Sequence, residues 1–127
     1  MTSQAFTAEL LDRQAEFDGL EPELEMTVRD PELGVEGYVI VWSTRAVAEG
    51  PLGRVGKGGT RITPTVTAAE VGRLARTQTL KNAAAGLATG GAKSGLRADP
   101  AADGFEQRYR KFVQLTWPCH YDNGGPW

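Results

Sequence analysis

Residues 38–43, YVIVWS, constrain the fold more strongly than any other stretch of the sequence. The run is continuously apolar and rich in β-branched residues, which is typical of a strand buried on both faces. Such a strand needs covering layers on both sides of its sheet. Residues 23–29, ELEMTVR, alternate between apolar and polar side chains and predict a half-exposed strand. The two strands are separated by a predicted turn over residues 30–37.

Helical patterns occur in three places. Residues 6–20 carry apolar side chains at roughly helical spacing, which predicts a short amphipathic helix. Thr67 and Glu70 form a capping box that begins a second helix, and Gly86 ends it. A third helix is predicted over residues 103–117.

The remaining pattern places strands between these helices. Residues 49–59 form a glycine-rich loop, residues 60–62 enter a strand, and a further strand lies between the second and third helices. The tail over residues 119–127 is too short and glycine-rich to predict another element. We therefore expect an α/β fold, bordering on α+β, with one three-layer-like domain over residues 1–127 and a mixed sheet flanked by helices.

Composition excludes several classes of function. The chain has 127 residues, of which 14 are basic and 16 acidic, so it lacks the surplus of basic residues that would indicate a nucleic-acid partner. No apolar run reaches the roughly 20 residues that span a bilayer, and the N-terminus does not resemble a secretory signal. The single cysteine excludes an internal disulfide, and with one histidine it predicts no metal site. We expect a cytoplasmic protein.

Two simple chemical interpretations fail on spacing. A phosphate-binding loop needs glycine, four residues, then Gly-Lys-Ser/Thr, and the segments around Lys57 and Lys93 each depart from this pattern twice. No Gly-x-Gly-x-x-Gly occurs, so the dinucleotide fingerprint is absent. Cys119 and His120 are adjacent, and neighbouring side chains diverge, so they do not indicate a nucleophile and its base.

Three lysines lie in uncharged, small-residue surroundings: Lys57 in VGKGGT, Lys81 in TLKNAA and Lys93 in GGAKSG. Clustered ammonium groups lower one another's pKa, and burial adds to this effect. A lysine with a lowered pKa can act as a base near neutral pH, while its neighbours hold carboxylates. The residues alone leave two alternatives open, a lysine-lined cleft and scattered surface lysines.

The segments GKGGTRITP and TLKNAAAGLATGGAKSGLRADP strongly resemble the N-terminal domain of the Glu/Leu/Phe/Val dehydrogenase family. This is the substrate-binding and dimerisation domain of amino-acid dehydrogenases, and the match is continuous from about residue 50 to residue 100. The resemblance implies that Lys93 is the catalytic lysine, which activates the water that attacks the imine during oxidative deamination. It also implies that Lys81 binds the substrate α-carboxylate.

The resemblance assigns further positions. Lys57 corresponds to the residue that reaches the side-chain carboxylate in glutamate-type enzymes, and Gly58 and Gly59 correspond to glycines that line that pocket. Asp122, in YDNGGPW, is the counterpart of a catalytic aspartate in an Asp-x-Gly-Thr context, with glycine in place of threonine.

The family continues with a Rossmann NAD(P) domain, which these 127 residues do not contain. We therefore expect the substrate-binding half of an NAD(P)-dependent amino-acid dehydrogenase, with NAD(P) supplied only by a partner or a downstream domain and no hydride transfer by this chain alone. The alternatives are a stand-alone binding module for amino acids or 2-oxo acids, a small nicotinamide-independent enzyme that reuses Lys93, and a purely structural dimer block. A homo-oligomer is expected in every case, because strand 23–29 offers an unpaired edge.

Overall fold

The computed structural model describes residues 2–127, and a mixed sheet forms its centre. The sheet order is β1-β2-β5-β3, and β4 also pairs with β5, further along that strand. β1, β2 and β5 are antiparallel neighbours, while β3 and β4 run parallel to β5. The elements are α1 (Ser3–Asp18), β1 (Leu24–Asp30), β2 (Val35–Ser43), β3 (Gly56–Lys57), β4 (Thr60–Thr63), α2 (Ala68–Ala84), β5 (Gly90–Arg97) and α3 (Phe105–Thr116).

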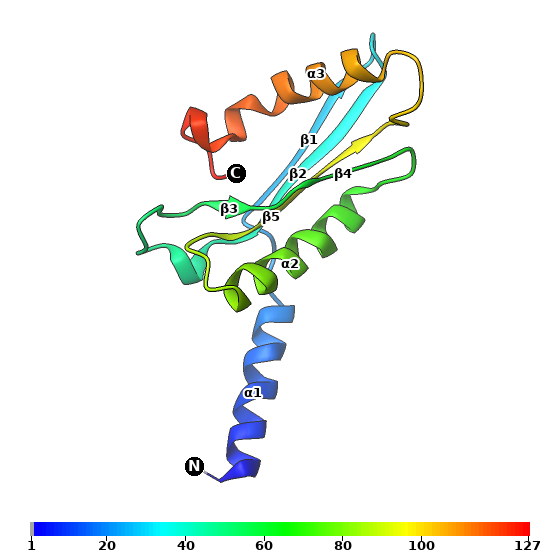
Figure 1. Cartoon of the computed structure of the whole chain (residues 1–127). Coiled ribbons are helices and arrows are strands. Elements are labelled where there is room, and N and C mark those ends of the chain that lie inside the picture. The colour runs from blue at the N-terminus through cyan, green and yellow to red at the C-terminus, as the bar shows by residue number, and fades with distance from the viewer. Residues whose placement is uncertain (1) are drawn as a thin grey trace.

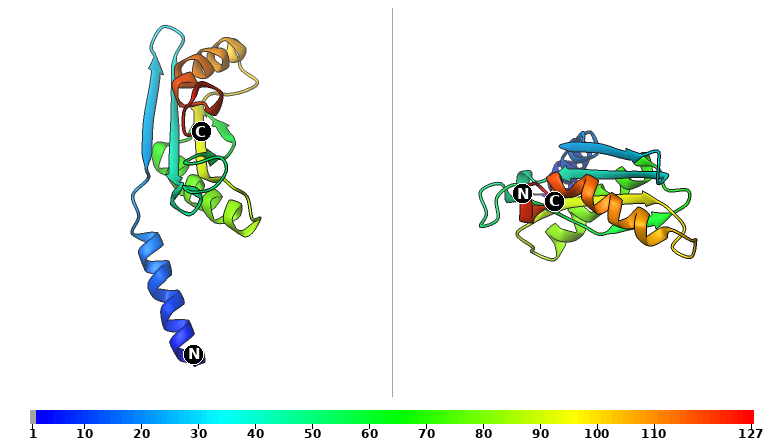
Figure 2. Two further views of the ribbon diagram at one scale, coloured as in Figure 1. Left: turned by 90° about the vertical axis from the view of Figure 1, so that its left-hand side faces the viewer. Right: turned by 90° about the horizontal axis from the view of Figure 1, so that it is seen from above.

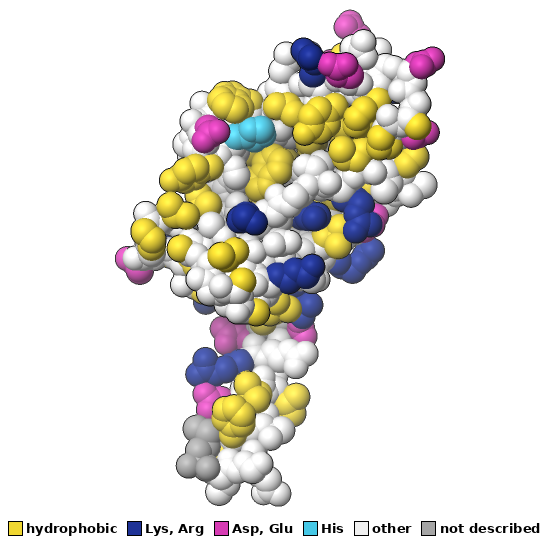
Figure 3. Space-filling view, viewed as in Figure 1, with side chains coloured by type: hydrophobic (Ala, Val, Ile, Leu, Met, Phe, Trp, Pro, Cys, Tyr) yellow, Lys and Arg dark blue, Asp and Glu magenta, His cyan; other side chains and the backbone are white. Residues whose placement is uncertain are grey.

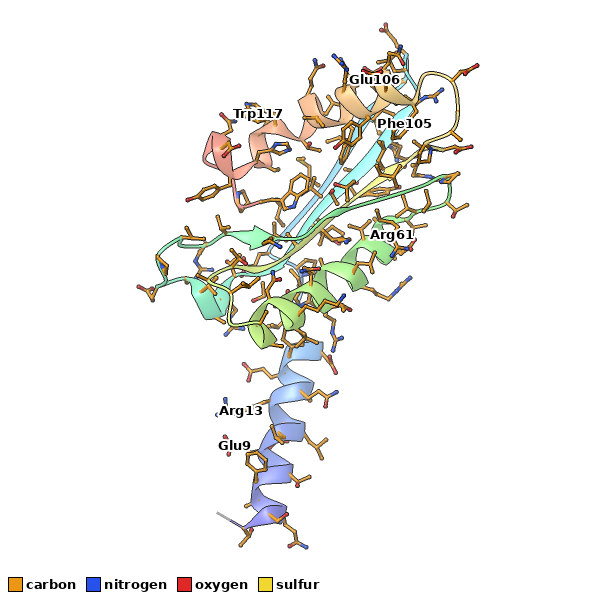
Figure 4. The ribbon with its side chains drawn as sticks, viewed as in Figure 1. Glu9, Arg13, Arg61, Phe105, Glu106 and Trp117 are labelled. Carbon is orange, nitrogen blue, oxygen red and sulfur yellow. The ribbon has the colours of Figure 1, made fainter. Side chains whose placement is uncertain are left out.

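Helices cover both faces of the sheet, as a strand buried on both sides requires. Figure 1 looks at the β3–β4 edge, with α3 on one face and α2 on the other, and Figure 2 shows the same layers from above. One apolar cluster joins Val28, Leu96 and Phe112 beneath α3, and Phe105 points into it from the start of that helix (Figure 4). A second cluster joins Ile40 and Val71 beneath α2. The predicted α/β fold with a mixed, helix-flanked sheet is confirmed.

The strands show the pattern of buried and exposed residues that the sequence predicts, but their bounds differ from the predicted ones. β1 alternates as expected, with Val28 buried and Glu25, Thr27 and Arg29 exposed. β2 begins at Val35, three residues before the predicted strand, because its pairing with β1 continues to Asp30. The predicted turn over residues 30–37 was therefore too long.

The helix ends follow from local backbone chemistry. The Thr67 hydroxyl accepts a hydrogen bond from the Glu70 amide (3.2 Å), which confirms Thr67 as the cap of α2. The Glu70 carboxylate pairs with Arg61, so the reciprocal half of the predicted capping box does not form. Gly86 follows the helix with φ of 67°, a conformation that favours glycine. α3 begins at Phe105 after Gly104, so the prediction that it starts near Asp103 was two residues early.

α1 projects from the body as a separate arm (Figures 1 and 2). The predicted helix is confirmed, but none of its residues is buried, and Phe6, Leu10 and Leu11 are at least half exposed. At its end, Asp18 forms an ion pair with Arg76 of α2, and the Arg76 guanidinium lies 5.1 Å from the centre of the Phe17 ring. Within residues 2–127, every helix is too short or too polar to span a bilayer.

Candidate functional site

Lys93 lies at the middle of β5, the strand that pairs with β2, β3 and β4. Alternation along a strand puts Lys93 on the same face as Gly91 and Gly95, which both lie against α2. A Cβ atom at Gly91 would be 2.1 Å from the backbone nitrogen of Thr79, and one at Gly95 would be 2.5 Å from Val71. These glycines therefore let α2 pack directly on the strand that carries Lys93.

A second pair of glycines brings the β3–β4 connection against the same strand. A Cβ atom at Gly58 would be 1.6 Å from the carbonyl oxygen of Ala92, so only glycine fits there. The Gly59 carbonyl accepts a hydrogen bond from the Ser94 amide (3.1 Å). A Cβ atom at Gly59 would be 3.7 Å from Lys93 Nζ, so this backbone passes beside the ammonium group. Side chains in this connection would cover the approach to Lys93.

Two cations lie close enough to Lys93 to affect its pKa. Burial lowers the pKa of Lys93 below its ordinary value of 10.5, and the positive charges of Arg61 and Lys81 lower that pKa further. Arg61 points from β4 toward α2 (Figure 4), where it pairs with Glu70 at 3.3 Å. Figure 3 shows Lys and Arg side chains gathered in the centre of this face, with acidic side chains mostly at its margins. Within residues 2–127, Lys57, Lys81 and Lys93 form no ion pair with a carboxylate.

Asn82 of α2 holds the strands β3 and β5 in place through its side chain. Its buried side-chain amide donates hydrogen bonds to the carbonyl oxygens of Lys57 (3.0 Å) and Gly90 (2.7 Å), and its own oxygen accepts one from Gln78 (2.8 Å). One side chain of α2 thus joins the ends of β3 and β5. Because Asn82 directly follows the exposed Lys81, its position also sets the place of that lysine.

Lys57 and Gly58 border a separate pocket of about 310 Å³. The Lys57 side chain is exposed, and it is not among the charges that lower the pKa of Lys93. The tail borders this open pocket, because Tyr121 and Trp127 line it together with residues of β3. The predicted pocket-lining place of Gly58 thus has a geometric counterpart, while Gly59 lies closer to Lys93.

Asp122 borders a pocket whose lining contains none of the three lysines. It belongs to a short 3-10 turn, Tyr121–Asn123, and is exposed beside a pocket of about 210 Å³ that is also lined by His120 and Trp127. Its charge does not contribute to the lowered pKa of Lys93. The prediction that the tail forms no further element was wrong, because the segment makes two 3-10 turns and folds back onto β3.

Sequence reasoning missed three residues of this region: Arg61, Asn82 and Trp127. Arg61 lies in the segment GKGGTR, but the side of the sheet to which it points depends on the pairing of Thr60 with Ser94 (2.6 Å), which only the structure shows. Asn82 had a weaker signal, an amide in an alanine-rich helix next to a lysine. The place of Trp127 depends on a long-range contact that no local pattern announces.

The residues present do not fit a dinucleotide. The family's cofactor needs a glycine-rich turn between a strand and a helix N-terminus, and the Gly-x-Gly-x-x-Gly pattern is absent from the chain. The segment before α2, Thr63–Thr67, contains proline and threonine in place of such a turn.

Comparisons with known proteins point to one family. The family model described as Glu/Leu/Phe/Val dehydrogenase, dimerisation domain, matches residues 22–121. A hetero-hexameric glutamate dehydrogenase from Thermus thermophilus, in its leucine-bound form, is 25% identical with a TM-score of 0.60 and is matched over 91% of this chain and 31% of its own. Glutamate dehydrogenase from Peptoniphilus asaccharolyticus is also 25% identical, with a TM-score of 0.61 over 87% of this chain and 31% of its own.

L-tryptophan dehydrogenase from Nostoc punctiforme is 25% identical with a TM-score of 0.56, over 81% of this chain and 29% of its own. The chain thus spans about a third of the length of the solved enzymes it matches. No protein with a curated description matches it. The family match confirms the resemblance drawn from the lysine segments: the chain belongs to the Glu/Leu/Phe/Val dehydrogenase family, as its dimerisation domain.

Proposed function

We propose that this chain binds an α-amino acid or the matching 2-oxo acid and provides the substrate-binding part of an amino-acid dehydrogenase. The observation that carries the proposal is the half-buried Lys93, whose pKa is lowered beside Arg61 and Lys81. Within residues 2–127, Lys93 and Lys81 have no carboxylate partner, and cations that repel one another in this way form a ready site for an anion. The carboxylate of the substrate has the charge and size to fill it.

Each lysine has a distinct part in the proposal. Lys81 binds the α-carboxylate from the last turn of α2, and Lys57 with Gly58 and Gly59 borders the substrate side chain. When a 2-imino acid is bound, water attacks its C2 atom and the neutral amine of Lys93 takes the water proton. Lys93 then returns that proton to the nitrogen, the C–N bond breaks as the hydroxyl oxygen forms the carbonyl of the 2-oxo acid, and the hydroxyl proton leaves with the ammonia as ammonium.

Asp122 is proposed as a second proton carrier in this step. It is exposed on the turn Tyr121–Asn123, so the proposal has it exchange the proton with the reacting group through water. Asp122→Asn tests the role: we expect unchanged binding of a 2-oxo acid and slower hydrolysis of an imine. Equal hydrolysis rates in the variant and the wild type would remove Asp122 from the site.

Binding can be measured directly by calorimetry and by NMR with pyruvate, L-alanine and larger 2-oxo and amino acids. We expect Lys81→Ala to weaken binding by about tenfold or more, as for a lost charge-assisted contact. Arg73→Ala is the matched control, since Arg73 is another exposed cation on α2, and it should bind like the wild type. Absence of binding at millimolar ligand, or equal binding by Lys81→Ala, would refute the proposal.

The lowered pKa of Lys93 also favours a second function, formation of an imine by Lys93 itself with a 2-oxo acid. The amine nitrogen bonds to the carbonyl carbon and water leaves. Borohydride reduction followed by mass spectrometry should then find the adduct on Lys93 in the wild type and not in Lys93→Arg. An unmodified Lys93 would count against this function.

We further propose that the domain forms homo-oligomers in the cytoplasm. The outer edge of β1 pairs with no strand within residues 2–127, so its backbone groups can pair with the same strand of a second copy. Light scattering at micromolar concentration should give a dimer or larger. A monomer at that concentration would contradict self-association.

A further inference from the structure

The tail after α3 is fastened to the loop that borders the side-chain pocket. The Gly56 amide donates a hydrogen bond to the Pro126 carbonyl (2.7 Å), and the Trp127 amide donates one to the Cys119 carbonyl (2.9 Å). The indole Nε1–H of Trp127 donates to the Gly58 carbonyl (3.2 Å). Figure 1 shows this segment returning from the end of α3 toward β3. Trp127 therefore holds a fixed place beside Lys57 and Gly58.

An aromatic stack keeps the indole in that place. The His120 ring lies between two indoles, 5.2 Å from Trp117 and 5.1 Å from Trp127, with edge-to-face geometry on both sides. Nε2 of His120 is 3.1 Å from the Thr116 hydroxyl of α3. Trp127 is thus positioned through His120 by the last turn of a packed helix, and it acts as a wall.

The pocket beside this wall is open to solvent, and its surface is mainly apolar. Its volume is about 310 Å³, and its apolar lining comes chiefly from Leu52, Val55, Tyr121 and Trp127. Volumes of roughly 300–1,000 Å³ are typical of small-molecule sites. Lys57 is the only charged residue in the lining, and its exposed ammonium group remains in water while its methylene groups border the pocket.

We propose that Trp127 is a specificity-determining residue and that this pocket takes a bulky apolar side chain of the amino or 2-oxo acid. The inference rests on the proposed function, because one ligand must reach from the lysine cluster to this pocket. Two adjacent glycines join the two places, since Gly58 lines the pocket and Gly59 lies beside Lys93 Nζ. Burying a second carboxylate among these apolar walls would cost free energy that an ion pair with exposed Lys57 does not recover. The pocket therefore discriminates against acidic side chains.

The test compares three 2-oxo acids by calorimetry: pyruvate, 4-methyl-2-oxopentanoate and 2-oxoglutarate. We expect wild-type protein to bind 4-methyl-2-oxopentanoate at least about tenfold more tightly than either of the others, the discrimination typical of a few methylene groups in an apolar pocket. Trp127→Ala and the exposed-wall variant Leu52→Ala should each reduce that preference over pyruvate by about fivefold or more. Tyr109→Ala, an exposed aromatic on α3 outside the pocket, is the matched control and should keep the wild-type preference.

The possible outcomes separate the two proposals. If no 2-oxo acid binds the wild type, the proposed function fails and the inference falls with it. If pyruvate binds through Lys81 but the preference for the bulky acid is absent or survives both wall variants, the inference alone is refuted. Tighter binding of 2-oxoglutarate that is lost in Lys57→Met also overturns it, since Lys57 would then select an acidic side chain.

Discussion

Replacing Gly58 with alanine should test how much the close packing of the β3–β4 connection against β5 contributes to stability. The added Cβ atom would lie 1.6 Å from the Ala92 carbonyl oxygen, whereas ordinary contact begins at 3.4 Å. The connection must therefore retreat by about 1.8 Å, the difference between these distances. That movement breaks the hydrogen bond from the Ser94 amide to Gly59 (3.1 Å) and the one from the Trp127 indole to Gly58 (3.2 Å).

At about 0.5–1.5 kcal/mol for each net hydrogen bond, Gly58→Ala should lower the free energy of unfolding by about 1–3 kcal/mol. Gly59→Ala is the matched control, because its Cβ atom would meet Lys93 Nζ at an ordinary 3.7 Å and neither glycine has a left-handed backbone. Both substitutions reduce the conformational freedom of the unfolded chain equally, so the difference between their free energies of unfolding reports the effect of the clash alone. Urea unfolding monitored by tryptophan fluorescence measures this difference, and equal urea midpoints for the two variants would refute the reasoning.

Three further predictions concern the lysine cluster and its support. Arg61→Ala and Lys81→Ala should each raise the pKa of Lys93, the first by more, in ¹³C NMR titrations of reductively methylated protein; an unmoved pKa would show that neither charge reaches it. Lys93→Met should be more stable than the wild type at pH 7, because the folded state disfavours the charged amine. This gain in stability should shrink as the pH rises toward 10.5, where the amine loses its charge in the folded and unfolded states alike. A gain that stays constant with pH would contradict this prediction. Asn82→Ala should lower the free energy of unfolding by about 1–3 kcal/mol in urea, because the carbonyl groups of Lys57 and Gly90 lose this donor, and a loss below about 0.5 kcal/mol would show that water replaces the amide.

Local patterns were enough to predict most elements of the fold. The alternation around Val28, the apolar run of β2 and the Thr67 cap each depend on neighbours within a few residues, and each is confirmed. The glycine-rich strand β5 was harder, because glycine weakens isolated strands. β5 is stable because it is central and because Gly91 and Gly95 admit α2, and both facts depend on residues distant in sequence.

The candidate site was predictable to the same extent. The three lysine segments could be identified from the sequence, and the structure brings Lys93 and Lys81 close enough to affect the pKa of Lys93. The separate pocket at Lys57 could not be predicted, since its far wall comes from Trp127, 70 residues later. The place of Asp122 at a pocket without the lysines is likewise a result of how the tail folds back.

The projecting helix α1 should be less stable than the rest of the chain. Its attachment to α2 relies on Arg76, through the Asp18 carboxylate and the Phe17 ring, and none of its residues is buried. Helices of this length are marginal in water without tertiary contacts, so α1 should unwind and re-form independently of the sheet. Its amide hydrogens should therefore exchange with solvent orders of magnitude faster than those of β5. A surface that covered Phe6, Leu10 and Leu11 would slow that exchange, so the exchange rate of this one helix reports whether the arm is engaged.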